Sequence, residues 1–525
     1  MRKSGGSIVR SDHRSVAAPC LVPCKHHEGF IVTDNRKKIS ADIDTFQDIK
    51  KKSLAGMSAL FVRQILVKAI FFVGNIVLAR LLAPQIFGFY AIAGFVVQFF
   101  STFGDVGIGA ALIQKKGELS REELSTTFWM QQMLVWLVVG GIFAAAPMAL
   151  KVYPTLPPVG VWLIRALAVS FLFSSLKTIP AILMERNIDF KRIAWVDIAE
   201  NLAFQVTAIS GAVLGLEAWS FILAAVVRSL LGTVIIYSVS PWRPAFVFRF
   251  ESAKGLVRFG LPYQGNQILS FIKDAVTPLF VGAYAGAAAV GYVNWARNFA
   301  FAPLLISESF GRVAFPAFSR LQEDRELLAR TVERSMRMMT LVLFPITAIM
   351  VALGPELTHV LFTDTWMPGI HVFYLYCMSP GGIGVFLPLY SAILSLGNTR
   401  ILLLISLCLV AAEWGMGVYF VIHYGFTGVA FSQLILVPLC TFVYVLVLQR
   451  NGIHVGIFSN IGRQLVAAVL VIAVVSLAKT YFQPTILNIG LLASLSGFIY
   501  LLFIRWTRRA LLDEFREYLS KMVKR

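Results

Sequence analysis

The stretch LLLISLCLVAAEWGMGVYFVIHYGFTGVAFSQLILVPLCTFVYVLVL, residues 402–448, contains only one Asp, Glu, Lys or Arg residue, Glu413. A helix needs about 20 mostly apolar residues to cross the hydrocarbon core of a bilayer. The stretch is long enough for two such helices, and Gly425 marks a turn between them. It therefore predicts two transmembrane helices, over 401–423 and 427–448.

The composition extends this prediction to the whole chain. Of the 525 residues, 57% are hydrophobic and 14% are charged, and the mean hydropathy is +0.74. Soluble proteins average about 25% charged residues. We predict an all-α integral membrane protein, which excludes a cytosolic enzyme, a secreted disulfide scaffold and a nucleic-acid-binding protein despite the net charge of +19. The five cysteines are too few and too scattered for a disulfide framework.

Applied along the chain, the length criterion predicts about 14 transmembrane helices. Polar residues interrupt the second, seventh and eighth of them. The expected spans are 57–80, 86–110, 128–150, 160–184, 194–215, 218–239, 260–284, 288–311, 338–361, 369–396, 401–423, 427–448, 464–482 and 485–505.

The basic residues predict the orientation of these spans. Outside the spans, Lys and Arg fall almost entirely in both tails and in alternate loops, whereas only Arg80, Lys151 and Lys479 fall on the other side. Loops rich in Lys and Arg stay in the cytoplasm. We therefore expect an even number of spans, with both termini on the cytoplasmic side of the membrane.

The chain also shows a weak internal repeat. A shift of 203 residues aligns the Gln-Ile-Leu at 64–66 with that at 267–269, and Gly88 with Gly291. We expect two parallel six-helix lobes around a central cavity, followed by two additional helices. The expected parts are a polar, disordered cytoplasmic tail (1–53), an N-lobe (54–250), a C-lobe (251–450), an appended helix pair (451–505) and an amphipathic cytoplasmic tail (506–525). Residues 319–337 predict a charged helical connector.

Polar residues recur at helical spacing inside several spans. A charge in a bilayer is costly, so such residues are expected to face a wet interior. We interpret these stripes as the lining of an aqueous cavity built mainly from spans 1, 2, 7 and 8, although each residue could instead form an interhelical hydrogen bond or ion pair. The polar lining residues expected are Gln64, Asn75, Gln98, Asn266, Gln267 and Asn294.

Basic side chains outnumber carboxylates inside the spans, which suits an anionic substrate such as a phosphate. The first candidates for binding it are Arg63, Lys68, Lys273 and Arg297, and the second are Arg165, Lys177 and Arg228. Asp105 or Asp274 could bind a coupling proton or sodium ion, or could simply pair with a nearby cation. We find no phosphate-binding loop, zinc-protease helix or other cofactor motif, and we expect no resident cofactor or metal.

Several motifs of the chain resemble the Wzx-type polysaccharide flippases, a family of the multidrug/oligosaccharidyl-lipid/polysaccharide exporter superfamily. They are LARLLAP at 78–84, FGFY at 87–90, FGDVG at 103–107, AALIQ at 110–114, FWMQ at 128–131 and ERNIDFKR at 185–192. The resemblance covers roughly residues 54–450. Within the family, the chain is most similar to the colanic-acid and succinoglycan exporters.

The resemblance implies that the protein is a transporter rather than an enzyme. It implies two lobes around a central cavity. It also implies translocation of undecaprenyl-pyrophosphate-linked oligosaccharide to the outer leaflet of the bacterial plasma (inner) membrane by alternating access, for exopolysaccharide or lipopolysaccharide synthesis. Its expected partners are this lipid-linked glycan, membrane lipids, and polysaccharide polymerase and co-polymerase proteins. The alternatives are a cation-coupled drug exporter or lipid II exporter of the same fold, and a membrane polysaccharide polymerase.

Overall fold

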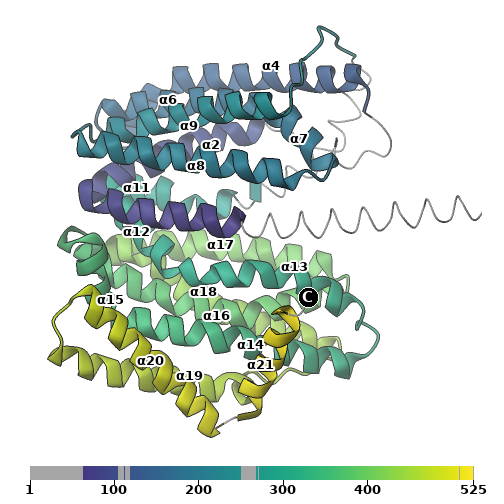
Figure 1. Cartoon of the computed structure of the whole chain (residues 1–525), viewed down its shortest axis with the longest axis vertical. Helices are drawn as coiled ribbons and strands as arrows, with labels where there is room; N and C mark the ends of the chain where they lie inside the picture. The colour runs from purple at the N-terminus through teal and green to yellow at the C-terminus, as the bar shows by residue number, and fades with distance from the viewer. Residues whose placement is uncertain are drawn as a thin grey trace, which may run out of the picture. The chain divides into compact units, whose positions relative to one another are not determined.

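The computed structural model describes residues 63–104, 112, 119–249, 268–269, 271–507 and 509–523. These residues form helices joined by turns and bends, and no β-strand occurs among them (Figure 1). The prediction of an all-α protein is confirmed. The predicted tail at 1–53 and the residues Asp105, Asn266 and Gln267 lie outside the described residues.

The helices before residue 240 pack against one another and form what we call the N-terminal bundle. A capping box starts one of them, α4, because the Ser120 hydroxyl accepts from the Glu123 amide at 3.2 Å and the Glu123 carboxylate accepts from the Ser120 amide at 3.3 Å. The helices are Arg63–Leu81, α2 (Pro84–Gly104), α4 (Arg121–Ala145), α5 (Ala149–Val152), α6 (Val159–Leu176), α7 (Thr178–Arg186), α8 (Phe190–Val213) and α9 (Ala218–Val239).

The helices after residue 270 form the C-terminal bundle. It includes a π-helical turn, η2 (Val276–Val281), which follows the helical residues 271–274, and its hydrophobic core lies between α14, α16, α18 and α19. Its elements are α11 (Gly282–Ala285), α12 (Ala287–Ala300), α13 (Leu305–Ser319), α14 (Arg325–Ala352), α15 (Gly354–Leu357), η4 (Thr358–Phe362), η5 (Asp364–Gly369), α16 (Ile370–Ser395), α17 (Thr399–Tyr424), α18 (Gly428–Arg450), α19 (Ile457–Ala478), α20 (Ile486–Thr507) and α21 (Arg509–Val523).

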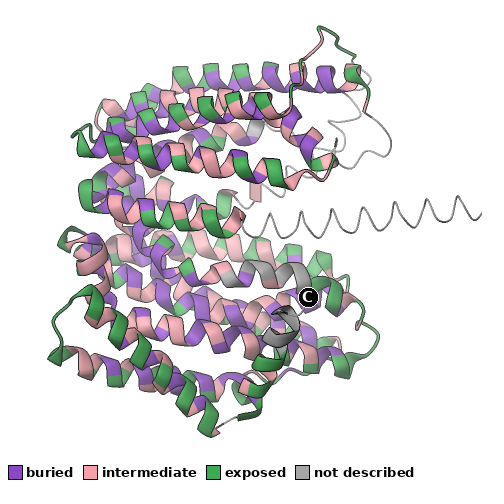
Figure 2. Cartoon of the chain, in the orientation of Figure 1, coloured by how far each residue is buried: buried purple, intermediate pink, exposed green. Residues whose placement is uncertain are grey.

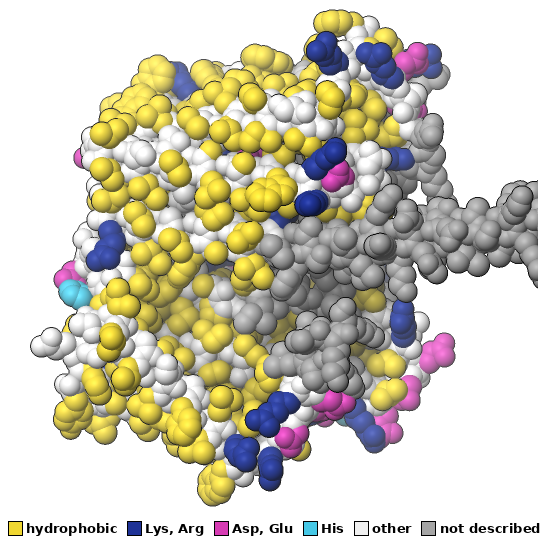
Figure 3. Space-filling view, viewed as in Figure 1, with side chains coloured by type: hydrophobic (Ala, Val, Ile, Leu, Met, Phe, Trp, Pro, Cys, Tyr) yellow, Lys and Arg dark blue, Asp and Glu magenta, His cyan; other side chains and the backbone are white. Residues whose placement is uncertain are grey.

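The surface of both bundles is that of a protein in lipid. Figure 2 shows exposed positions along the outward faces of the helices, and Figure 3 shows that hydrophobic side chains cover most of the visible face. Large apolar side chains such as Leu137 (71% exposed) and Leu214 (76% exposed) stand on this surface. In water their exposure would be costly, so the chain is a multi-pass membrane protein.

Ten helical segments of the described chain are long and apolar enough to cross a membrane. One of them, Thr399–Arg450, contains both α17 and α18, the two helices predicted from the apolar stretch at 402–448. Three predicted spans are absent from the ten, and one of them, 260–284, lies partly outside the described residues. Asp197 and Glu200 interrupt the apolar run of α8, and α12 has only 14 residues. The count of fourteen spans and the lobe boundaries stay predictions.

Three boundaries differ from the sequence-based expectation. The charged segment predicted as a connector at 319–337 instead continues into a span, because Asp324 caps one helix, α14, that runs to Ala352. The span predicted at 288–311 is broken near Pro303, where α12 ends and α13 begins. The span predicted at 160–184 divides at Lys177 into α6 and α7.

The amphipathic tail is helical, as predicted, and forms α21. Its apolar face packs against the C-terminal bundle, where Leu511 is 2% exposed. A salt bridge of 2.9 Å between Arg334 of α14 and Glu514 of α21 holds the same contact. At least this part of α21 therefore packs on protein.

The two bundles meet where α2 crosses α12. A Cβ atom added to Gly88 of α2 would overlap the carbonyl oxygen of Ala287, and one added to Gly291 of α12 would overlap that of Pro84. Glycine is required at both positions because the two backbones touch. The contact is reciprocal, as at an interface related by a two-fold axis. The repeat found in the sequence pairs the same residues, since a shift of 203 takes Pro84 to Ala287 and Gly88 to Gly291.

Candidate transport cavity

A cavity of about 1530 Å³ lies between the two bundles. Its walls come from the helix Arg63–Leu81, from α2, from residues 271–278 and from α12 with the turn that follows it. These elements are the predicted spans 1, 2, 7 and 8, and α6, α8, α9 and η4 each add one aromatic side chain to the wall. Small-molecule pockets usually measure about 300–1,000 Å³, so this cavity can hold a larger substrate.

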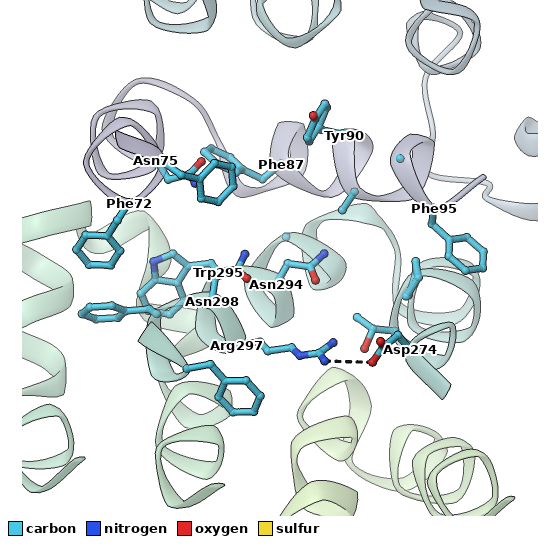
Figure 4. Close-up of a pocket in the computed structure, with 18 of the residues that line it drawn as sticks. Phe72, Asn75, Phe87, Tyr90, Phe95, Asp274, Asn294, Trp295, Arg297 and Asn298 are labelled. Atoms are coloured by element: carbon cyan, nitrogen blue, oxygen red, sulfur yellow. Dashed lines mark hydrogen bonds and ion pairs between the residues drawn. The ribbon is translucent and has the colours of Figure 1, made fainter. Parts of the chain in front are cut away.

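Aromatic side chains are the largest group in the cavity wall, and no sequence pattern predicted this. In Figure 4, the helix that carries Phe87, Tyr90 and Phe95 lies across the cavity from Asn294 and Arg297. The aromatic lining residues are Phe71, Phe72, Phe87, Tyr90, Phe95, Phe171, Phe204, Phe221, Phe271, Trp295, Phe299, Phe301 and Phe362. A Phe on an apolar helix is equally suited to core, lipid or cavity, so only the packing reveals this role.

Amide side chains provide the uncharged polar part of the wall. Asn75, Gln98 and Asn294 line the cavity, and so does Asn298 of α12 (Figure 4). An amide group both donates and accepts hydrogen bonds, so these residues can bind hydroxyl groups. Gln64 is not among the lining residues.

The first cluster of charged residues, which we call the cavity-side cluster, consists of Lys273, Asp274, Arg297 and Glu413. The Arg297 guanidinium donates to Asp274 Oδ1 at 3.1 Å, and Lys273 Nζ lies 3.9 Å from the same oxygen. Half of the Asp274 and Lys273 side chains and 31% of the Arg297 side chain are exposed. Arg297 and Asp274 line the main cavity and can therefore meet a substrate there.

A small side pocket extends this cluster into the C-terminal bundle. Arg297, Asp274 and Lys273 line it together with Glu413 of α17 and Gln433 of α18. Glu413 is the single charged residue of the apolar stretch at 402–448, a signal that the sequence analysis recorded without assigning it to a site.

The second cluster, which we call the bundle-side cluster, lies within the N-terminal bundle. Arg63 forms a 3.0 Å salt bridge with Asp197, and Glu200 pairs with Lys177 and lies 3.9 Å from Arg228. Glu200 is 5% exposed, and it fits against α9 because position 232 is a glycine, where a Cβ would overlap the carboxylate.

One end of the cavity is closed by contacts between the bundles. Trp366 of η5 is fully buried and donates from Nε1 to the Ala79 carbonyl at 2.8 Å, and its ring meets that of Phe87 at 5.2 Å. Next to it, Thr155 accepts a hydrogen bond from the Ala287 amide at 3.1 Å. Together with the glycine crossing of α2 and α12, these contacts hold the bundles together at the end of the predicted outer loops.

The sequence from residue 77 to residue 371 matches the model of a family described as polysaccharide biosynthesis protein. The chain belongs to this family. It is 28% identical over 451 residues to the succinoglycan biosynthesis transport protein ExoT of Rhizobium meliloti, a match that covers 83% of this chain and 89% of that protein. It is 25% identical over 336 residues to the lipopolysaccharide biosynthesis protein WzxC of Escherichia coli, covering 63% of this chain and 67% of that protein.

Two solved structures have a similar fold. The lipid II flippase MurJ in an inward closed conformation superposes with a TM-score of 0.71 at 15% identity and covers 87% of this chain and all of that one. An inward-facing multidrug resistance MATE transporter of the MOP superfamily superposes with a TM-score of 0.58 at 14% identity. This match covers 74% of this chain and 98% of that one. The predicted fold class and the resemblance to Wzx-type flippases are confirmed, and the chain is a membrane transport protein of polysaccharide biosynthesis.

The structure separates the seven basic residues proposed for anion binding. Lys68 and Arg297 line the cavity, whereas Arg63, Lys177 and Arg228 lie in the bundle-side cluster, where they pair with Asp197 or Glu200. Lys273 lines the side pocket. Arg165 lies apart from both clusters, between the rings of Trp162 and Phe143. The carboxylate Asp274, a candidate for the coupling ion, is held by Arg297.

Proposed function

We propose that this protein moves an undecaprenyl-pyrophosphate-linked oligosaccharide from the cytoplasmic to the outer leaflet of a bacterial inner membrane. The observation that carries the proposal is the cavity of about 1530 Å³ between two bundles, with basic, amide and aromatic side chains on its walls, in a chain of this family. The orientation that puts both termini in the cytoplasm belongs to the proposal and rests on the distribution of Lys and Arg.

In this proposal the diphosphate is held between Lys68 and Arg297. The two residues reach the cavity from different bundles, so an anion between them would connect the bundles. A guanidinium binds phosphate through paired, charge-assisted hydrogen bonds. The substrate must compete with Asp274 for Arg297, which makes the Arg297–Asp274 pair a resting state that the diphosphate replaces.

The glycan would occupy the rest of the cavity. Sugar rings present hydroxyl groups at their edges and C–H groups on their faces. The amides Asn75, Asn294 and Asn298 can bind the hydroxyl groups, and aromatic faces such as that of Trp295 suit the C–H faces. The polyprenyl chain would stay in the lipid between the bundles, because it is as apolar as the membrane.

Translocation would proceed by alternating access. The contacts around Trp366 and the crossing of Gly88 with Gly291 close one end, which is the outer end in the proposed orientation. Release requires these contacts to separate and the opposite end to close, as in rocking of two repeats about a shared site.

We propose a proton or a sodium ion as the coupling ion, with Asp274 as its first binding candidate. Glu413 joins Asp274 in the side pocket, so the two carboxylates can share an ion or a proton. Asp105 stays a prediction from the sequence. Polysaccharide polymerase and co-polymerase proteins are proposed partners, since the flipped unit must be polymerised in the outer leaflet.

A deletion strain of the source bacterium tests the function. We expect its lipid-linked repeat unit to accumulate on the cytoplasmic leaflet, where a membrane-impermeant glycan-modifying enzyme added to spheroplasts cannot reach it. Expression of the intact chain should restore access. An accessible repeat unit in the deletion strain would overturn the proposal. Accumulation of lipid II, or sensitivity to drugs with normal polysaccharide, would support the alternative exporters instead.

A further inference from the structure

Arg165 is a basic residue that the proposed transport cycle does not use. It lies on α6, six residues after the helix begins at Val159, which corresponds to roughly 9 Å along the axis. It shares a face of the helix with Trp162, which is 55% exposed, rather than with Phe171, which lines the cavity. The guanidinium therefore stands at the lipid-facing surface, in one half of the bilayer.

Arg165 contacts two aromatic rings, and no carboxylate of the described chain neutralises its charge. Its guanidinium lies 5.4 Å from the ring of Trp162 and 5.7 Å from the ring of Phe143 on α4. Its Nε is buried without a hydrogen-bond partner, and within the described chain the residue forms no salt bridge. A charged side chain among apolar groups costs several kcal/mol unless it is paired or reaches the interface. The two rings attract the guanidinium by cation–π contact, but they supply no hydrogen-bond acceptor and no negative charge.

The neighbouring surface of α4 has room for an apolar chain. Met133, Trp136 and Leu137 are 72%, 61% and 71% exposed and recur on one face of the helix. Farther along, a Cβ added at Gly140 or Gly141 would meet no atom within 4 Å. An open apolar strip thus runs along the helix that carries Phe143.

We propose that Arg165, Trp162 and Phe143 form a binding site for the phosphate of an anionic phospholipid, with an acyl chain along α4. The phosphate diester of a phospholipid carries one negative charge, which would neutralise the unpaired guanidinium. Its two free oxygens can accept a pair of hydrogen bonds from the guanidinium edge. In the proposed orientation the lipid belongs to the outer leaflet. The site is independent of the transported substrate, because Arg165 faces away from the cavity.

Lipid retention by the purified intact protein tests the site. Native mass spectrometry in detergent is carried out with added phosphatidylglycerol for the wild type, Arg165→Gln and Arg165→Lys, with Arg400→Gln as a matched control at another exposed basic position. We expect Arg165→Gln to weaken binding of one phosphatidylglycerol about tenfold, Arg165→Lys to weaken it less, and Arg400→Gln to leave it unchanged. Thermal unfolding without added lipid shows whether each variant is folded.

Each competing outcome overturns a stated part of the proposal. Equal retention by the wild type and a folded Arg165→Gln would remove the site. Displacement of the lipid by millimolar inorganic phosphate would show a site for free anions rather than for phospholipid. Tighter binding of undecaprenyl diphosphate than of phosphatidylglycerol at Arg165 would assign the surface to the transported lipid, whatever the outcome of the transport experiment.

Discussion

The cavity-side and bundle-side clusters contain the same kinds of residues in different environments. In the bundle-side cluster, Glu200 is almost fully buried and accepts from Lys177, and even a Cβ at position 232 would overlap its carboxylate. In the cavity-side cluster, Asp274 and Lys273 are half exposed, and Arg297 opens onto the cavity. The first arrangement holds helices together, whereas the second leaves charge available to a substrate.

The difference shows that a count of membrane-embedded cations does not define an anion site. A buried pair with one partner removed leaves an uncompensated charge, and this costs about 3–5 kcal/mol. Removing one partner from a pair at the wall of a wet cavity costs less stability, because water and substrate can replace the missing partner. Stability and transport should therefore respond in opposite ways to substitutions in the two clusters.

The largest expected effect on stability follows from Glu200→Gln. This change leaves Lys177 and Arg228 without their shared carboxylate inside the N-terminal bundle. We expect the free energy of unfolding to fall by about 3–5 kcal/mol. Thermal unfolding in detergent and abundance in the membrane measure the loss. The matched control is Glu413→Gln, and an equal loss in the control would remove the distinction between the clusters.

The largest expected effect on transport follows from Arg297→Gln. The variant should fold and reach the membrane, because a half-exposed pair is removed, but transport should fall about 30-fold or more as a charge-assisted contact to the diphosphate is lost. Arg297→Lys should recover part of the activity, because lysine keeps the charge without the paired geometry. Normal flipping by the glutamine variant would show that the diphosphate is bound elsewhere.

The sequence predicts the membrane fold well because apolar runs are long and their ends are marked. The run 218–239 coincides with α9, and the four spans predicted to line the cavity all contribute to its wall. The weaker predictions fall where helices break inside a run. Neither the division at Lys177 nor the break at Pro303 has a charge cluster that would mark a loop.

The candidate site is harder to predict, because helical spacing shows which residues share a face and not where that face points. Arg63 and Lys68 are both in the first helix, yet one pairs with Asp197 and the other lines the cavity. Asp197, the partner of Arg63, lies on α8, far along the chain. The role of Glu413 also depends on packing, because its charged neighbours in the side pocket come from α12 and residues 273–274.

Substitutions at two glycines test the same difference between the buried cluster and the open cavity wall, with smaller expected changes in stability. At Gly232, a Cβ would overlap the Glu200 carboxylate and displace it from Lys177, so Gly232→Ala should lower stability by about 1–3 kcal/mol. At Gly94, which lines the cavity, a Cβ would meet no atom within 4 Å. Gly94→Ala should therefore raise stability by about 0.5–1 kcal/mol, as expected for alanine inside a helix. Thermal unfolding compares the two, and similar shifts would contradict the assigned environments.

The smallest expected effect belongs to Arg63→Gln. Arg63 and Asp197 are 31% and 38% exposed, so their salt bridge is worth about 0.2–1 kcal/mol at most. Since Arg63 does not line the cavity, transport should stay within about threefold of the wild type. A double-mutant cycle with Asp197→Asn measures the coupling between the two side chains. If Arg63→Gln abolishes transport while its coupling to Asp197 is near zero, Arg63 must leave its partner and enter the cavity during the cycle, and the bundle-side cluster would then also be a substrate site.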